Sequence, residues 1–188
     1  MESLNAAVND LIWQIQDDDR IRDTVDLGIF VFGNKGRDPI HSGFQAMSEY
    51  GQIYIYATDT STYVADTLSM TMDAIRERID LYAQGGGAYK PWIVLITDGE
   101  FHDGTALEEV ARRMKQRQAE NKLQFFGLGV KGYSEEQLNS LTNDPRQVLE
   151  VKAVNFSDFL SWVGRSMATV SSNAVDTEVT LEPLVFTV

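Results

Sequence analysis

Apolar residues recur at intervals of three and four positions in several stretches of the chain, which is the spacing of an amphipathic helix. The first such stretch opens the chain, with an apolar face made of Leu4, Val8, Leu11, Ile12 and Ile15. The same spacing predicts helices over about 63–82, 106–120 and 157–170. Three glycines at 85–87 mark the end of the second helix, and Ser134-Glu135-Glu136-Gln137 is a capping-box pattern that predicts a further short helix.

Short apolar runs between these helices predict β-strands. Trp92–Thr97 is almost continuously apolar, which is typical of a parallel strand covered on both faces. Other strands are predicted at 26–33, 123–130, 148–151 and 184–188. Strands that alternate with helices predict an α/β fold with a doubly wound, mostly parallel, Rossmann-like sheet and helices on both faces. The length of 188 residues suits a single domain over 1–188.

The charge of the chain bears on its choice of partner. There are 16 Lys and Arg residues against 28 Asp and Glu residues, which gives a formal net charge of −12. Because such a surface repels phosphate backbones, we expect no nucleic-acid partner. It favours cations and basic protein surfaces, although a need for solubility explains the charge equally well.

Cysteine usage and hydropathy limit the kinds of site and location. The chain has no cysteine, which excludes disulfides and thiolate metal sites. No apolar run approaches the ~20 residues of a membrane-spanning helix, so no membrane association is expected. The opening residues Met1–Asn5 lack the pattern of a signal peptide, and we therefore expect a cytoplasmic location.

The turn after the strand Trp92–Thr97 holds the most informative acidic residue. Ligands of parallel sheets bind beyond the carboxyl ends of the strands, and Asp98 follows the most buried of the predicted strands. Its carboxylate is a candidate ligand for a hard divalent cation, and Gly99 permits a tight turn. The structural alternative is that Asp98 caps the following turn.

The segment Val94-Leu95-Ile96-Thr97-Asp98-Gly99-Glu100 resembles the fourth-strand motif of von Willebrand factor A domains. In that family the Asp belongs to a metal-ion-dependent adhesion site that holds Mg²⁺, together with an Asp-x-Ser-x-Ser loop and a Thr before a later helix. The segment Asp59–Leu68 resembles the part that supplies the Thr. The resemblance therefore implies Asp98 and Thr62 as ligands of Mg²⁺ or another divalent cation. Capping of the next helix is the alternative for Thr62.

The similarity extends over about residues 1–180. Residues 123–130 resemble the fifth strand of the family. Residues 154–163 and 171–173 resemble the end of the bacterial TerY-like group, which is associated with tellurite resistance and stress signalling. The resemblance implies a non-enzymatic adaptor that binds a protein partner. We expect the partner to contact four residues around the predicted ligands, namely Ser61, Glu100, His102 and Asp103.

The order of the elements departs from that of the family. The first strand and the Asp-x-Ser-x-Ser loop should precede the opening helix, yet the chain begins with that helix. Leu184–Val188 reads as the missing strand, so we expect a circularly permuted arrangement with this strand at the centre of the sheet. A missing loop of about five residues then places Met1 and Val188 within about 18 Å of each other. Asp98 and Thr62 alone are too few for tight Mg²⁺ binding, so the site is vestigial or completed by residues outside this sequence.

Three other interpretations stay open. Asp59-Thr60-Ser61-Thr62-Tyr63 is itself close to Asp-x-Ser-x-Ser and is an alternative first-strand loop. A Rossmann-like enzyme that acts on a small molecule or nucleotide is a second alternative, which requires a deep pocket with convergent polar groups. An engineered or split scaffold with an incomplete metal site is the third. The Gly-x-Gly-x-x-Gly match at 127–132 does not open a helix, so it predicts a strand end and turn rather than a dinucleotide site.

Overall fold

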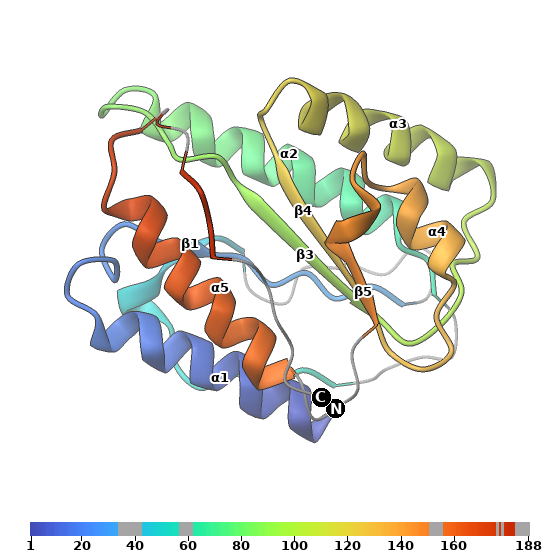
Figure 1. The fold of residues 1–188 in the computed structure, drawn as a ribbon, viewed down its shortest axis with the longest axis horizontal. Coiled ribbons are helices and arrows are strands. Elements are labelled where there is room, and N and C mark those ends of the chain that lie inside the picture. The colour runs from blue at the N-terminus through green and yellow to red at the C-terminus, as the bar shows by residue number, and fades with distance from the viewer. Residues whose placement is uncertain (34–42, 57–61, 151–155, 176, 178, 183–188) are drawn as a thin grey trace. The chain divides into compact units, whose positions relative to one another are not determined.

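The described part of the chain forms two compact units in a computed structural model (Figure 1). The first unit comprises Met1–Ile29, Ser42–Ala57 and Ala153–Val188, and the second comprises Phe30–His41 and Thr58–Lys152. Within these bounds, the structure describes residues 1–33, 43–56, 62–150, 156–175, 177 and 179–182. We describe each unit by itself, and the expectation of a single domain over 1–188 stays a prediction.

A parallel sheet of three strands forms the centre of the second unit. Its order is β3 (Trp92–Thr97), β4 (Gln124–Gly129) and β5 (Val148–Glu150). Trp92 pairs with Gln124 and Thr97 with Gly129, so β3 and β4 end level with each other. The predicted α/β fold with parallel strands is confirmed, and the carboxyl ends of β3 and β4 meet at one edge.

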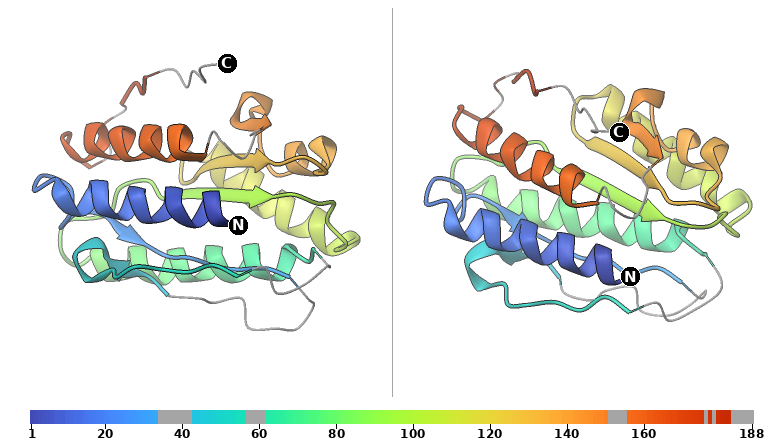
Figure 2. Two further views of the ribbon diagram at one scale, coloured as in Figure 1. Left: turned by 90° about the horizontal axis from the view of Figure 1, so that it is seen from below. Right: turned by 60° about the horizontal axis from the view of Figure 1, so that its bottom comes forward.

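Helices cover both faces of this sheet. Figures 1 and 2 place α2 (Ala65–Tyr82) and α4 (Glu135–Ser140) on opposite faces. Between β3 and β4 the chain forms α3 (Thr105–Ala119), and the short helix η2 (Pro145–Gln147) precedes β5. Consecutive residues of β4 are buried on alternating faces, which requires cover on both sides; these are Phe125, Phe126, Gly127 and Leu128.

Local signals in the sequence set the ends of two of these helices. Gly86 and Gly87 after α2 have φ of 123° and 97°, values that glycine adopts at low cost. The Ser134 side chain accepts a hydrogen bond from Gln137 N–H at the start of α4. The glycine stop and the helix start at Ser134 are both confirmed.

Two helices pack against each other in the first unit. They are α1 (Glu2–Asp17) and α5 (Phe156–Ser171), and their apolar faces bury Leu11, Ile15 and Phe159, among others. A Cβ built on Gly164 of α5 would lie 3.3 Å from Leu11 Cδ1, so a glycine here permits close packing of the helices. None of the helices in the described residues is both long and apolar enough to span a membrane.

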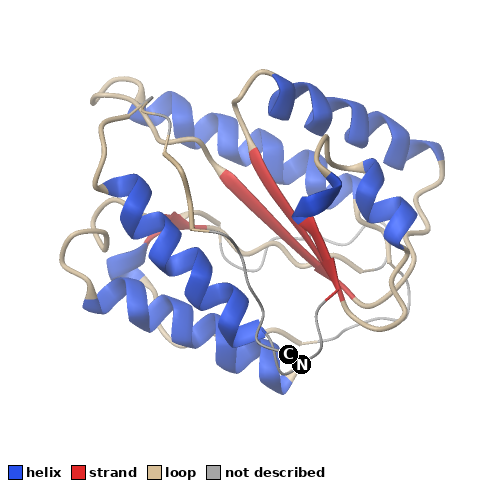
Figure 3. Cartoon of the chain, viewed as in Figure 1, coloured by secondary structure: helices blue, strands red, loops and turns tan. Residues whose placement is uncertain are grey.

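Of the strand expected over 26–33, regular pairing is described only in part, so this expectation is confirmed in part. Within the described residues, β1 (Asp26–Leu27) forms a ladder antiparallel to β2 (Gln45–Ala46), which leads into the short helix η1 (Met47–Glu49) (Figure 3). Gly28 follows β1 directly, and glycine weakens strands because it has no side chain to pack. Further along, Gly33 forms an isolated bridge with Tyr63. The proposed central strand 184–188 lies outside the described residues.

The acidic run 17–19 lies at a helix end. Asp17 is the last residue of α1, and the Arg20 side chain donates hydrogen bonds to the carboxylate of Asp18. These bonds, followed by one from the Arg20 backbone N–H, lower the pKa of Asp18 from 3.8 to about 2.

We predict that Arg20→Gln raises the carboxyl titration midpoint of Asp18 from about 2 toward 3.8. Because the pKa is lower in the folded state, any stability from this pair is present above about pH 4 and lost as the pH falls toward 2. Carboxyl ¹³C chemical shifts during acid titration measure the midpoint. The control is Arg112→Gln, which removes the ion pair with Glu109 and should leave Asp18 unchanged. A midpoint near 3.8 in the unsubstituted protein would contradict the pairing.

Candidate functional site

A tight turn follows β3 at the carboxyl edge of the sheet and displays Asp98. The Thr97 hydroxyl donates to the Gly99 carbonyl at 3.2 Å and accepts from the Gly99 N–H at 3.3 Å. Val130 N–H donates to the Thr97 carbonyl at 2.7 Å, which ties this turn to the end of β4. Asp98 itself is exposed. Its carboxylate therefore stands where ligands bind in parallel sheets.

The structure brings Thr62 next to this turn. A Cβ built on Gly99 would lie 3.2 Å from Thr62 Oγ1, closer than most Cβ contacts in proteins. The small size of Gly99 thus lets the hydroxyl approach the residue that follows Asp98. The two metal ligands predicted from separate motifs lie in neighbouring segments of the fold, while Ser61 and the alternative loop residues 59–61 lie outside the described residues.

His102 holds the backbone of Thr62 in place. The His102 N–H donates to the Thr62 carbonyl at 2.9 Å, and His102 Nδ1 accepts from the Thr62 N–H at 3.1 Å. Because Nδ1 is an acceptor here, a neutral imidazole carries its proton on Nε2. The ring also lies beside that of Tyr63, with centroids 6.0 Å apart. His102 remains exposed, so it both positions Thr62 and presents a ring edge to solvent.

Asp103 caps helix α2 from a distant part of the sequence. Its Oδ2 accepts from the Val64 N–H and its Oδ1 from the Ala65 N–H, each at 2.9 Å. The cap residue Val64 makes no side-chain capping bond of its own. The capping role considered for Thr62 is therefore filled by Asp103. Both carboxylate oxygens of Asp103 have structural partners, and its predicted contact with a protein partner stays a prediction.

Gln137 of α4 clamps the same loop at Phe101. Phe101 N–H donates to Gln137 Oε1 at 2.7 Å, and Gln137 Nε2 donates to the Phe101 carbonyl at 3.0 Å. Phe101 is buried, whereas Glu100 before it is exposed. Three successive residues of the loop are thus anchored. The sequence pattern placed Gln137 in a capping box and contained no signal for this clamp.

Gly132 packs against the backbone of Asp98, and we predict that Gly132→Ala destabilises the turn. Its φ is +109°, and a Cβ built there would lie 2.8 Å from the Asp98 carbonyl oxygen. We expect the free energy of unfolding to fall by about 1–3 kcal/mol, because strain and a backbone contact act together. Urea denaturation measures the change, and Gly43→Ala, which meets nothing within 4 Å, is the control. Equal losses in the two variants would contradict this packing.

The donors around the turn suit a hard cation in kind but are too few in number. Asp98 offers a carboxylate and Thr62 a hydroxyl, whereas Mg²⁺ prefers six oxygen ligands. Within the described residues, no group of three or more His, Asp or Glu residues is arranged to hold a metal ion. The described residues alone therefore do not make a complete metal site.

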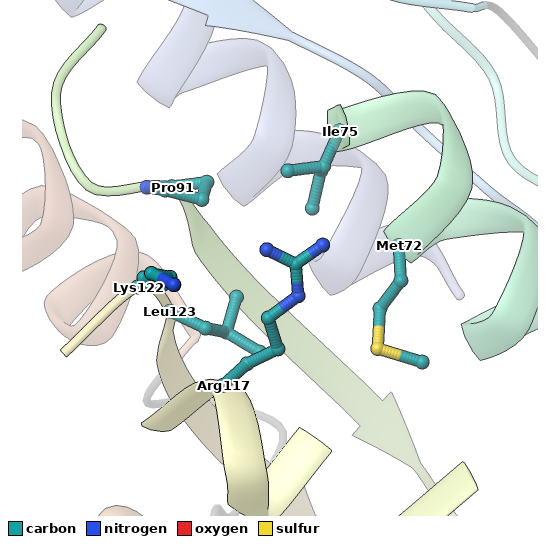
Figure 4. A pocket seen from close by; sticks show the side chains of 6 residues that line it. All are labelled: Met72, Ile75, Pro91, Arg117, Lys122 and Leu123. Atoms are coloured by element: carbon teal, nitrogen blue, oxygen red, sulfur yellow. The ribbon is translucent and has the colours of Figure 1, made fainter. Parts of the chain in front are cut away.

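A shallow, open depression lies at the opposite end of the strands (Figure 4). Pro91, just before β3, and Leu123, just before β4, contribute to it. Figure 4 shows the Arg117 guanidinium directed into the space between Pro91, Ile75 and Met72. The walls are mainly apolar, so this depression does not provide the convergent polar groups that a small-molecule enzyme requires.

Comparisons with known proteins agree with this architecture. The sequence matches the model of the von Willebrand factor type A domain over residues 2–163. A comparison with curated proteins gave no match. Among solved structures, proximal thread matrix protein 1 (PTMP1) from the mussel byssus is similar with a TM-score of 0.54 and 16% identity, covering 89% of this chain and 43% of that chain.

Two other structures of the mussel protein are also similar. A second crystal form has a TM-score of 0.54 and 14% identity, and covers 89% of this chain and 43% of that chain. A structure with a zinc-occupied MIDAS motif, the metal-ion-dependent adhesion site, has a TM-score of 0.52 and 15% identity, and covers 89% and 42%. The chain thus spans less than half the length of the solved structures that it matches, and at these identities the likeness concerns the fold.

Proposed function

Because the chain belongs to the von Willebrand factor type A domain family, we propose that it is a non-enzymatic module that binds a protein partner at the carboxyl edge of its parallel sheet. Domains of this family commonly mediate protein interactions. The observation that carries the proposal is the approach of the Thr62 hydroxyl to Gly99, directly after the exposed Asp98. Glu100 and His102 are also exposed and extend the proposed binding surface.

A divalent cation takes part in this proposed binding and is held only weakly by the protein without its partner. The mussel protein has a structure in which zinc occupies its MIDAS motif, which supports cation binding by this fold. Asp98 and Thr62 would hold the ion, and oxygen donors of the partner would add the ligands that are missing. A bound cation would supply positive charge to attract a carboxylate. The anchored loop keeps Asp98 and Thr62 close together before the partner arrives.

A cytoplasmic role in bacterial stress signalling, with tellurite resistance as one instance, completes the proposal. Its support is the resemblance of residues 154–163 and 171–173 to the TerY-like group. A circular permutation belongs to the same proposal, since the opening helix precedes the expected first strand. Sequencing of the gene together with its neighbourhood tests both points. Stress-response genes beside it would support the signalling role, and an Asp-x-Ser-x-Ser loop encoded ahead of the opening helix would reject the permutation.

Photo-crosslinking tests the proposed binding surface. Glu100 is replaced by p-benzoylphenylalanine, and the same replacement at Glu77 on α2 is the control, because both residues are exposed. In buffer with Mg²⁺, we expect the position-100 variant to form a discrete crosslinked product with a partner. The position-77 variant should not form this product. Asp98→Ala in the position-100 variant should abolish the crosslink.

Other outcomes distinguish the parts of the proposal. A crosslink that persists with EDTA but disappears with Asp98→Ala would support the proposed binding surface and contradict the proposed role of the cation. A crosslink that is indifferent to Asp98→Ala, or equal at positions 77 and 100, would reject the surface itself.

A further inference from the structure

Side-chain amides of helix α1 bind the extended segment 51–56 at two of its residues. Figure 2 shows the backbone of this segment beside α1. The Asn9 amide donates to the Ile53 carbonyl and accepts from the Ile53 N–H, both at 2.9 Å. The Asn5 amide donates to the Ile55 carbonyl at 2.9 Å and accepts from the Ile55 N–H at 2.7 Å. Two residues of this segment therefore have both main-chain groups satisfied by one asparagine each.

The spacing of the two asparagines explains why this pairing works. Residues four apart on a helix rise by about 6 Å, and residues two apart on an extended strand by about 6.7 Å. Asn5 and Asn9 thus present their amides at nearly the repeat of Ile53 and Ile55. On this edge, the helix takes the place that a neighbouring strand would occupy.

The opposite edge of the same segment is open. Successive residues of an extended chain direct their N–H and C=O groups to opposite edges, so those of Gln52 and Tyr54 point away from α1. Within the described part of the chain, these main-chain groups have no hydrogen-bond partner. Burial alternates in the same way, with Gln52, Tyr54 and Tyr56 exposed and the two isoleucines half-buried. The segment therefore has one edge paired with α1 and one edge whose main-chain groups are open to a further strand.

Two exposed aromatic rings lie along this edge. Tyr54 is 53% exposed and Tyr56 68% exposed, and their rings are stacked with centroids 6.5 Å apart. The residues from Gln52 to Tyr56 carry no charge, although the chain as a whole carries −12. Aromatic faces attract Arg and Lys side chains, and the net charge attracts a basic partner over longer distances.

We propose that this edge accepts an extended, basic segment of a protein partner, which adds as a β-strand and places Arg or Lys side chains over Tyr54 and Tyr56. Main-chain hydrogen bonds to Gln52 and Tyr54 supply the pairing, and the two rings select positive charge. The surface involves neither Asp98 nor Thr62, so it is a second binding surface, independent of the function proposed above.

Amide hydrogen exchange tests this proposal on the full chain with a defined probe, an N-acetylated hexapeptide of alternating Arg and Val. In the free protein, we expect the Ile53 and Ile55 amides to exchange slowly and the Tyr54 amide to exchange fast. With peptide at about ten times its Kd, exchange at Tyr54 should slow about tenfold. The same peptide with every amide N-methylated keeps the charge but cannot pair, and should leave Tyr54 exchange unchanged.

Substitutions separate main-chain pairing from attraction to the rings. Tyr54→Pro removes both the outward N–H and the ring, and should raise the Kd of the probe peptide about tenfold or more. Tyr54→Ala removes only the ring and should raise this Kd about threefold. Trp13→Ala, which removes another exposed aromatic side chain, should leave Kd unchanged. Circular dichroism verifies that each variant is folded.

Three results would overturn the proposal. The first is a Tyr54 amide as protected in the free protein as that of Ile53. The second is peptide binding that leaves Tyr54 exchange unchanged. The third is equal binding of the N-methylated peptide or of folded Tyr54→Pro.

Discussion

Replacing Phe125 with alanine is expected to lower the free energy of unfolding by about 3–5 kcal/mol, the largest loss that we predict for a single substitution. Phe125 lies in β4, the middle strand of the parallel sheet, and its side chain is 0% exposed. A Cβ built on Gly127 would lie 3.4 Å from its ring, so the neighbouring strand positions are already closely packed. The structure cannot refill the space of the ring, and a cavity adds to the lost burial.

Urea denaturation followed by circular dichroism measures this loss. Phe125→Leu should cost clearly less than Phe125→Ala, because leucine fills part of the space. Gln124→Ala, at a half-buried neighbouring position of β4, should cost less than about 1 kcal/mol. A loss below about 1 kcal/mol for Phe125→Ala would mean that this residue is not in a packed core.

Removing the carboxylate of Asp103 is expected to lower the free energy of unfolding by about 2 kcal/mol. Both oxygens accept backbone N–H groups in the first turn of α2, and Asp103 is half-buried. Asp103→Ala leaves these two donors without their partners. It also removes a stabilising negative charge from the positive end of the helix dipole. The same change should loosen Thr62, since His102 and Asp103 anchor one loop.

Hydrogen exchange at Val64 and Ala65, combined with urea denaturation, measures this effect. Asp103→Asn retains an acceptor oxygen and should show an intermediate loss. Asp66→Ala removes an exposed acid from the same first helical turn and should cost less than about 1 kcal/mol. If Asp103→Ala and Asp66→Ala cost the same, the paired capping bonds add nothing beyond general electrostatics.

Elements with a strong local signal could be predicted from the sequence. The helix expected to start near Tyr63 starts at Ala65, and the strand Trp92–Thr97 has the expected bounds. Periodicity reports which face of an element is buried, and this face is set by nearby residues. The place of Asp98 at the end of a buried strand followed from the same pattern, together with a general rule for parallel sheets.

Contacts between distant segments could not be predicted in this way. Asp103 caps a helix that begins 38 residues earlier in the chain, and Gln137 clamps a backbone 36 residues away. Both use common polar side chains whose partners only the tertiary fold defines. Asn5 and Asn9 read as polar positions on a helix, with no indication that they bind a strand. The bounds of the strand expected over 26–33 could not be set in the same way, because strand pairing depends on a partner that hydropathy does not reveal.

Mn²⁺ binding localised by NMR tests most directly whether Asp98 lies in a cation-assisted binding surface. In ¹⁵N-labelled protein at substoichiometric Mn²⁺, the amide signals of Gly99, Glu100 and Thr62 should broaden first, and excess Mg²⁺ should restore them. Asp98→Ala should remove this selective broadening while Glu77, on the exposed face of α2, stays unaffected in both proteins. Broadening spread evenly over the acidic surface, or unchanged by Asp98→Ala, would contradict the claim.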